Sequence, residues 1–314
     1  MDFVGKRRWF FLFSALIILP GLVSLIIPPS LHLGIDFTGG STITTKFRAP
    51  VSEEAVRSQL DLLGHPEATI QQSRGIDYFI RTRELAGPDL VTGELSEEAQ
   101  ILEALDGLGV REGTEVELVA GVIATDTRNS AFLIVFLAAI AILLFVTYAF
   151  RSVPSPFRYG MAAIIALVHD LVIILGIFSI LGKLIDLEVN AMFITGMLFV
   201  IGYSVNDTIV VFDRIRENVT RMQGQPLEVA INNSILESLG RSMATSLTLL
   251  FAILALLLLG GDSIREFLIV LLIAVITGTY SSICIASQFL VVWEKGEGRQ
   301  LLRSVPFFSS RSRS

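Results

Sequence analysis

The sequence predicts a polytopic α-helical membrane protein, with six transmembrane helices and one extracytoplasmic ferredoxin-like α+β domain. Three observations predict this class. Of the 314 residues, 52% are hydrophobic and only 17% are charged, whereas soluble domains carry about 25% charged residues. Several apolar runs reach the length of about 20 residues that a helix needs to cross a bilayer. The charged residues are concentrated between the first two runs and at the ends of the others.

The apolar runs give the spans in order. They are Trp9–Ile27, Ser130–Phe150, Phe157–Leu181, Asn190–Phe212, Ser242–Gly260 and Phe267–Trp293. The first run follows Lys6, Arg7 and Arg8, as the apolar core of a signal peptide would. It is too long for such a core, and no convincing cleavage site follows it. We therefore expect an uncleaved membrane anchor.

Lysine and arginine predict the orientation, because cytoplasmic loops are enriched in them. If the N-terminus is cytoplasmic, the short outer loops hold only Lys183 and Arg265. The inner segments then hold Lys6, Arg7, Arg8, Arg151, Arg158, Arg214, Arg216, Arg221, Arg241, Lys295, Arg299, Arg303, Arg311 and Arg313. Both termini are therefore expected in the cytoplasm. The predicted parts are 1–28 (N-terminus and first span), 29–128 (exported domain), 129–293 (spans two to six) and 294–314 (basic tail).

The region between spans one and two predicts a small α+β domain. Ser41–Phe47 alternates β-branched and polar residues, which is typical of a strand. The tetrapeptide "SEEA" occurs at Ser52 and again at Ser96, each time where a capped helix would begin. The segments "ATIQQSR" and "DYFIRTR" predict two strands around a turn at Gly75, and Thr114–Ile123 predicts a last strand. The order is β-α-β-β-α-β, the ferredoxin-like pattern.

Other features favour ordinary structural roles. Gly39 and Gly40, in "GIDFTGG", predict positive φ angles or a close backbone approach, but without a following lysine they do not indicate a phosphate loop. His32 and His65 are lone histidines expected on surface loops. The single cysteine, Cys284, excludes an intramolecular disulfide and gives no metal cluster. No basic patch with interleaved aromatic residues is present, so nucleic acid is not an expected partner.

Ionisable residues within the spans are the candidates for function, because each costs about 2.5–3.5 kcal/mol to insert. The segment "GYSVNDTIVVFDRIREN" places Asn206 and Asp207 inside span four. Ser204, Asp207 and Thr208 share one helical stripe. Asp213 points elsewhere and lies beside Arg214, so it is expected to be a solvated charge at the helix end.

Span five carries a complementary polar stripe. Its members are Ser238, Arg241, Ser242, Thr245 and Thr248. Arg241 is expected at the entrance to this span, on the same side of the membrane as Asp207. A movable pair of Asp207 and Arg241 could bind and release a proton as the arginine leaves and returns, whereas a rigid pair would be structural. His169 and Asp170 in span three predict either an auxiliary relay or interhelical hydrogen bonding, and their side chains are expected to point about 100° apart.

Taken together, these segments resemble one family. "GIDFTGG", the large domain after span one, "HD" in span three, "GYSVNDTIVVFDRIREN" and "LGRSMATSLTLL" are similar to SecF, the smaller subunit of bacterial SecD–SecF protein-export complexes. The resemblance covers nearly the whole chain and implies the resistance-nodulation-division type of transporter fold.

The resemblance also implies function. It implies a non-enzymatic accessory subunit of the Sec translocase that uses the proton gradient, without a cofactor, to promote late steps of preprotein export. The implied partners are SecD, the SecYEG channel and translocating preproteins, with YidC and YajC as further candidates. The family's intramembrane aspartate and arginine fall on Asp207 and Arg241. The auxiliary candidates for the proton pathway are His169, Asp170, Ser204, Asn206, Thr208, Asp213 and Thr245.

Three other functions remain open from the residues. A half-transporter of the same superfamily would export lipid or small molecules, although such exporters usually carry both six-span halves on one chain. An intramembrane enzyme would use Asp207, Asp213 or the His169–Asp170 pair, but the two aspartates lie on different helix faces and the pair offers too few metal ligands. A purely structural scaffold would need none of these groups to change protonation.

Overall fold

The structure is a computed structural model that describes residues 2–73, 76–87, 95–261 and 264–296. It divides into two compact units. The membrane unit comprises the described parts of Met1–His32 and Leu133–Ser314, and the sheet unit comprises those of Leu33–Phe132. The predicted turn at Gly75 and the predicted basic tail beyond residue 296 lie outside the described residues.

Within the described residues, six helices are long and apolar enough to cross a membrane, as predicted. They are α1 (Arg7–Ile26), α5 (Gly121–Ala149), α6 (Pro156–Ile185), α7 (Ala191–Arg221), α8 (Leu227–Leu259) and a last helix, Arg265–Glu294. Helices are the expected solution because all backbone hydrogen bonds are then made within each span. Pro156 occupies the first turn of α6, and the side chain of Asn190 caps α7 by accepting from the Phe193 amide at 2.9 Å.

The last helix is not uniform. It consists of α9 (Arg265–Ser281), a π-helical segment η2 (Ser282–Ala286) and α10 (Ser287–Glu294). The Ser287 hydroxyl donates to the Ser282 carbonyl at 3.0 Å across the widened turn. π-Helical turns of this kind occur frequently at functional sites.

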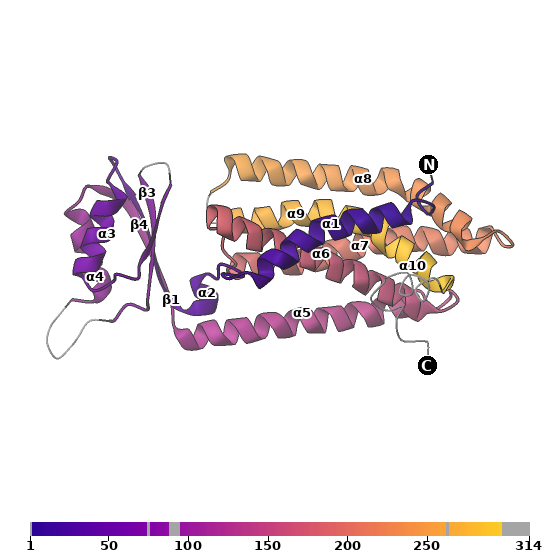
Figure 1. Cartoon of the computed structure of the whole chain (residues 1–314), viewed down its shortest axis with the longest axis horizontal. Helices are drawn as coiled ribbons and strands as arrows, with labels where there is room; N and C mark the ends of the chain where they lie inside the picture. Colours follow the sequence, from indigo (N-terminus) through magenta and orange to yellow (C-terminus); the bar gives the residue numbers. More distant parts are fainter. Residues whose placement is uncertain (1, 74–75, 88–94, 262–263, 297–314) are drawn as a thin grey trace, which may run out of the picture. The chain divides into compact units, whose positions relative to one another are not determined.

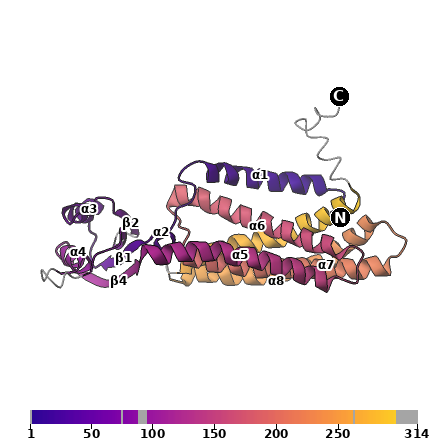
Figure 2. The ribbon, with the colours of Figure 1, turned by 90° about the horizontal axis from the view of Figure 1, so that it is seen from below.

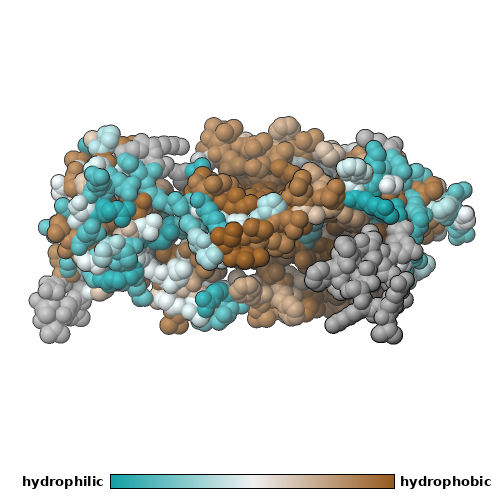
Figure 3. Space-filling model, viewed as in Figure 1, coloured by the Kyte–Doolittle hydropathy of each residue, from teal (hydrophilic) through white to brown (hydrophobic). Residues whose placement is uncertain are grey.

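The helices form an inner and an outer group. In α6, α7 and the last helix, 50%, 50% and 67% of the most apolar window is buried within the chain, against 11%, 6% and 17% in α1, α5 and α8. Figures 1 and 2 show α6, α7 and α9 running alongside one another in the bundle. Figure 3 shows hydrophobic residues over the visible face of the bundle. The outer helices thus present apolar side chains outward, as membrane-embedded helices do.

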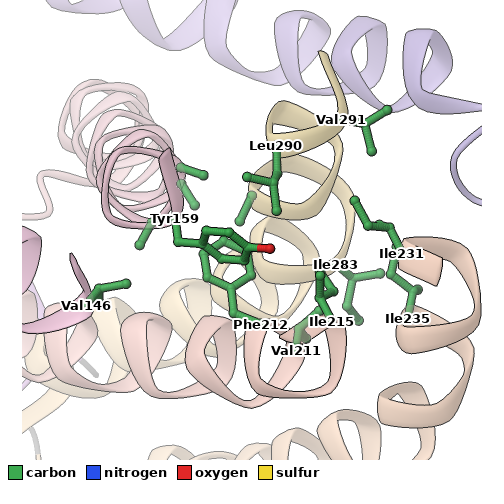
Figure 4. Packing of buried hydrophobic residues seen from close by; sticks show 14 of the residues in the cluster. Val146, Tyr159, Val211, Phe212, Ile215, Ile231, Ile235, Ile283, Leu290 and Val291 are labelled. Carbon is green, nitrogen blue, oxygen red and sulfur yellow. The ribbon is translucent and has the colours of Figure 1, made fainter. Parts of the chain in front are cut away.

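Aromatic and aliphatic side chains join five helices at one end of the membrane unit (Figure 4). Tyr159 of α6 packs edge-on against Phe212 of α7, with ring centroids 5.3 Å apart, and stacks on Phe150 at 5.4 Å. Elsewhere, Gly21 and Gly176 let α1 and α6 approach closely, since a Cβ on Gly21 would lie 2.8 Å from the Gly176 Cα. Such contacts between small residues favour helix association in lipid.

The sheet unit has the element order that the sequence predicts, preceded by a short helix. Its elements are α2 (Ile35–Thr38), β1 (Gly40–Phe47), α3 (Glu53–Leu62), β2 (Thr69–Ser73), β3 (Asp77–Thr82), α4 (Glu97–Asp106) and β4 (Arg111–Val119). The sheet order is β2-β3-β1-β4, and every neighbouring pair is antiparallel. Figures 1 and 2 show α3 and α4 on the same side of this sheet.

Alternation along the strands determines which side chains the helices cover. Ile43, Phe47, Tyr78 and Ile80 are fully buried, against residues such as Leu60 of α3. Both "SEEA" segments begin helices as predicted. The Ser52 and Ser96 hydroxyls accept from the amides three residues later, at 3.3 and 3.2 Å.

Gly39 and Gly40 meet both of the expectations for their positions. Their φ angles are 74° and 129°. A Cβ on Gly39 would lie 3.0 Å from the Gly121 Cα, and one on Gly40 would lie 2.6 Å from the Thr82 carbonyl oxygen. A residue with a Cβ would not fit at these two positions, where the chain enters β1 and passes close to the start of α5.

Several predicted boundaries are wrong. β4 ends at Val119 rather than Ile123, because the helix of span two begins at Gly121, well before Ser130. The apolar run Ser242–Gly260 is only the later part of α8. Arg241 therefore lies within a continuous helix, directly before the apolar run.

The predicted surface position of His65 is also wrong. Its side chain is 1% exposed, and its Nδ1 lies 2.9 Å from the Thr82 hydroxyl. Gly64, at φ 84°, turns the chain sharply after α3. The Glu67 carboxylate also accepts from the Thr82 hydroxyl, at 2.9 Å. The turn thus directs the histidine inward, which hydropathy alone could not indicate.

Candidate functional site

The buried acidic and basic side chains of the membrane unit lie on its inner helices. Among the described residues they are His169, Asp170 and Asp207. The first two come from α6 and the third from α7. Buried serine and threonine hydroxyls surround them, contributed by Ser14, Ser204, Thr208, Ser242, Ser281 and Ser282. A carboxylate within a bundle needs such donors, because an unpaired buried charge is strongly unfavourable.

Asp207 has a sparse environment. Its side chain is 8% exposed, and its Oδ1 accepts one hydrogen bond, from the Ser242 hydroxyl of α8 at 2.7 Å. Its Oδ2 is buried and makes no hydrogen bond within the part of the chain that the structure describes. An ionised carboxylate here would have one donor for two oxygens. A protonated one would need less solvation.

Arg241 does not contact Asp207 in this structure. The predicted stripe on α8 divides: Ser238 and Ser242 are buried, whereas Arg241, Thr245 and Thr248 are exposed. Side chains at neighbouring helix positions point about 100° apart. The edge of the stripe that carries Ser238 and Ser242 faces the other helices, so the edge that carries Arg241 faces away from them. The Thr245 hydroxyl donates to the Arg241 carbonyl at 3.0 Å, within its own helix.

Asp170 has the opposite environment to Asp207. It is fully buried, and its Oδ2 accepts from the Ser204 hydroxyl of α7 at 2.6 Å and from the Ser281 hydroxyl of α9 at 2.7 Å. Its Oδ1 lies 3.0 Å from the Nδ1 of His169. The Nε2 of the same ring lies 3.0 Å from the Ser14 hydroxyl of α1. The pair of His169 and Asp170 thus joins four helices through polar contacts.

This contact corrects one expectation. His169 and Asp170 do not point apart, because the imidazole bends back onto the neighbouring carboxylate. Interhelical hydrogen bonding, one of the two predicted roles, is present. Ser14 and Ser281 were missed from the sequence. The available signal was a hydroxyl within an otherwise apolar run, as in "FFLFSALIIL" and "TYSSICIAS".

The remaining predicted residues divide between interior and surface. Thr208 is buried, donates to the Ser204 carbonyl at 3.0 Å and lies 3.1 Å from the Ser282 hydroxyl. Asn206 is exposed. Asp213 is 57% exposed and pairs with Arg216 at 2.5 Å, as a charge at a solvated helix end would. Its interpretation as an anchoring charge agrees with this position.

Two further polar side chains are buried in the last helix. Gln288 is fully buried in α10, and neither its amide nitrogen nor its amide oxygen has a hydrogen-bond partner among the described residues. Cys284 is buried within η2. Across the described ranges, no three His, Cys, Asp or Glu side chains come together as metal ligands would.

Comparison with known proteins places the chain in a family. Residues 100–296 match the family described as protein export membrane protein SecD/SecF, C-terminal, and residues 31–51 match the SecD/SecF GG motif. Protein translocase subunit SecF of Thermobaculum terrenum is 42% identical over 308 residues, covering 96% of this chain and 97% of the relative. That of Anaerolinea thermophila is 38% identical over 310 residues, covering 95% and 96%.

A solved structure is also similar. The crystal structure of SecDF, a translocon-associated membrane protein from Thermus thermophilus, aligns with a TM-score of 0.79 and 32% identity. The alignment covers 94% of this chain but only 39% of that one. A second SecDF structure, in a super-membrane-facing form, aligns with a TM-score of 0.60 and 30% identity, covering 96% of this chain and 40% of that one. With relatives of this identity over nearly its whole length, the chain belongs to the SecF group of the SecD/SecF family of protein-export membrane proteins.

Proposed function

We propose that this chain is an accessory subunit of the Sec protein translocase that works with SecD and uses the proton gradient to promote late steps of preprotein export. Membership of the SecF group supports the translocase assignment. The likeness to part of a longer SecDF chain supports SecD as the partner, since this chain matches only 39% of that protein. The environment of Asp207 supports proton coupling.

One observation carries the proton-coupling step. Asp207 is buried with a single hydrogen-bond donor, Ser242, and an oxygen that makes no hydrogen bond to the described residues. A carboxyl group in such a site is held more easily in its protonated form, because desolvation disfavours the charge. To release the proton, the site needs a cation to replace it.

Arg241 is the cation that we propose for this purpose. It directly precedes Ser242 on α8, and its side chain is exposed in this structure. A rotation of α8 by about 100° would exchange the Ser242 position for the Arg241 position beside Asp207. In this cycle the present structure corresponds to the state with the arginine away and Asp207 protonated. Arrival of the arginine would then release the proton.

The sheet unit would be the exported part. Its β-α-β-β-α-β order and antiparallel β2-β3-β1-β4 sheet support a ferredoxin-like domain. The distribution of lysine and arginine supports cytoplasmic termini in the bacterial cytoplasmic membrane. We further propose the SecYEG channel and translocating preproteins as partners, with YidC and YajC as additional candidates.

The test is Asp207→Asn, which keeps the shape and the Ser242 contact but cannot ionise. With SecD and the translocase reconstituted in vesicles, the part of preprotein translocation that depends on the proton gradient should disappear. Asp213→Asn is the matched control, because Asp213 lies on the same helix but is exposed and paired with Arg216. Gradient-dependent translocation at the wild-type rate in Asp207→Asn would reject the proposed function.

A further inference from the structure

A chain of hydrogen bonds connects α1 to Asp170 and limits where hydrogens can be. It begins at the carbonyl of Phe10, which can only accept, so the Tyr280 hydroxyl must donate to it, at 2.7 Å. A phenol has one hydrogen. The contact of 3.2 Å between Ser14 and Tyr280 therefore needs the Ser14 hydroxyl as its donor.

The next contact then needs a hydrogen on the imidazole. Ser14 has one hydroxyl hydrogen, and Tyr280 takes it. The contact of 3.0 Å between Ser14 and the Nε2 of His169 is a hydrogen bond only if Nε2 carries a hydrogen. Three contacts join Phe10, Tyr280, Ser14 and His169, and the two hydroxyls supply hydrogens for two of them. The third hydrogen comes from the ring.

The other ring nitrogen faces Asp170. Nδ1 and Oδ1 are 3.0 Å apart, which requires a second hydrogen between them. The hydroxyls of Ser204 and Ser281 already donate to Oδ2 of the same carboxylate. Donors of this kind favour the ionised form of the carboxyl group. The second hydrogen therefore lies on Nδ1, and the imidazole carries both of its hydrogens.

We propose that His169 and Asp170 form a second proton-holding site in the membrane unit, an imidazolium–carboxylate pair that holds one proton more than a neutral histidine beside an ionised aspartate. The pair is neutral as a whole, as its burial requires. Among the described residues of the membrane unit, the buried acidic or basic side chains are these two and Asp207, so His169 is the group that can supply a counter-charge for Asp170. The basic residues of α1 and α6, Arg7, Arg8, Arg158 and Lys183, are not buried, and the other titratable groups near the pair, such as Tyr280 and Cys284, do not carry positive charge.

The site lies close to the candidate proton-coupling residue. Ser204 donates to Asp170 and lies three positions before Asp207, so about 4.5 Å of helix rise separates them on one face of α7. Thr208, which follows Asp207, bonds the Ser204 carbonyl and contacts Ser282 of η2. A shift of α7 that alters Asp207 would also alter a donor of Asp170. This part of the inference rests on the proposed function, whereas the proton count does not.

The alternative is a simple interhelical hydrogen bond. A neutral imidazole with its hydrogen on Nδ1 would bond Asp170 and leave Nε2 bare. Ser14 would then have to donate to both Nε2 and Tyr280 with one hydrogen, so one of the two observed contacts would be lost. The two alternatives differ at a single atom, the Nε2 of His169, and nuclear magnetic resonance can observe that atom.

The test is ¹⁵N nuclear magnetic resonance at neutral pH. The full chain is labelled with ¹⁵N-histidine and studied in lipid bilayers together with its partner. The chain has three histidines, and His169→Gln identifies the signals of interest. We expect both ring nitrogens of His169 to be of the protonated type. A bare ring nitrogen in the unaltered chain would overturn the proposal.

Asp170→Asn sharpens the result, because it removes the negative charge and keeps the shape. His169 should then lose one hydrogen and show one bare nitrogen, while the control Asp213→Asn keeps both hydrogens. Two protonated nitrogens in a folded Asp170→Asn chain would overturn the pairing. If that variant fails to fold, the spectrum of the unaltered chain still decides the proton count. Translocation by Asp207→Asn is a separate measurement, so failure of the proposed function is distinguishable from failure of this inference.

Discussion

The buried aspartates of the membrane unit differ in their partners from the arginine-paired acids of the sheet unit. In the sheet unit, Glu97 accepts from both terminal nitrogens of Arg83, at 2.6 and 3.1 Å, and Asp106 accepts from Arg111 twice at 2.7 Å. In the membrane unit, Asp170 and Asp207 accept from serine hydroxyls instead. An arginine partner supplies a full positive charge, whereas a hydroxyl partner supplies only a dipole, so the two kinds of site place different demands on a carboxylate.

The two buried aspartates differ from each other in the number of their partners. Asp170 has two hydroxyl donors and an imidazole, and Asp207 has one hydroxyl donor. Asp170 is therefore expected to matter more for stability, and Asp207 more for coupling. Substitutions at these aspartates and at the residues around them test this division.

The largest expected effect on stability is that of Asp170→Ala. This change leaves the donors Ser204, Ser281 and His169 without their acceptor inside the bundle. Breaking a buried pair in this way costs about 3–5 kcal/mol. Thermal unfolding of the purified chain in detergent should show a large fall in midpoint. Asp207→Ala, which releases one hydroxyl, should cost much less, and equal losses would contradict the division between the two aspartates.

Gly21→Ala should separate α1 from α6. Its Cβ would lie 2.8 Å from the Gly176 Cα, so the helices must move apart. Overpacking of this kind costs about 1–3 kcal/mol, and it should also lengthen the 3.0 Å contact between Ser14 and His169. The unfolding midpoint gives the first effect and the His169 nitrogen signals give the second.

Gly202→Ala on α7 is the matched control for that change. A Cβ there meets no atom within 4 Å, so the substitution should leave both the unfolding midpoint and the His169 signals as they are. If Gly21→Ala behaves like Gly202→Ala, the close approach of α1 and α6 does not hold the polar network together.

Ser242→Ala should have a smaller effect on stability. It removes the one observed donor to Asp207, and a single hydrogen bond contributes about 1 kcal/mol. Its functional effect should be larger, because the pH dependence of gradient-driven translocation should shift when Asp207 loses that donor. Ser238→Ala is the control one turn earlier, since the Ser238 hydroxyl donates only within its own helix. A pH profile shared by both variants would show that Ser242 does not act through Asp207.

The smallest effect is expected in the sheet unit. Its hydrogen bond to Arg83 holds the pKa of Glu97 below its ordinary value of 4.5. The stabilisation is therefore fully present above about pH 4.5 and is lost as the pH falls through the lowered pKa. Because both side chains are partly exposed, at 49% for Arg83 and 24% for Glu97, it amounts to no more than about 1 kcal/mol.

Hydrogen exchange of the sheet-unit amides in the full chain measures this loss. Glu97→Gln should lower protection at neutral pH and reduce its dependence on acid. The control is Glu103→Gln, on the same helix α4. Acid-dependent protection that is unchanged in Glu97→Gln would show that the arginine pair does not stabilise the unit.

Much of the fold could be predicted from the sequence because hydropathy and capping are local. Six apolar runs predicted the six long helices, and the two "SEEA" segments predicted the starts of α3 and α4. The ends of the helices were harder to predict. Both α5 and α8 begin well before their apolar runs, at Gly121 and Leu227. The residues between the helix start and the apolar run include polar ones, which hydropathy does not assign to a span.

The candidate site could be predicted only in part, because its contacts depend on helix rotation and on residues distant in the sequence. The stripe of Ser204, Asp207 and Thr208 is buried as expected. Which edge of the α8 stripe meets Asp207 could not be known, since Arg241 and Ser242 differ by one position. Ser14 contacts His169 across 155 positions of the chain, and no local pattern indicates such a contact.

Proton flow is the most direct test of the central claim, that Asp207 changes its protonation when the protein works. The chain and SecD are reconstituted in vesicles with an internal pH-sensitive dye, and a proton gradient is imposed. The unaltered chain and Asp213→Asn should both conduct protons, whereas Asp207→Asn should not. Proton flow through Asp207→Asn at the rate of the unaltered chain would contradict the claim.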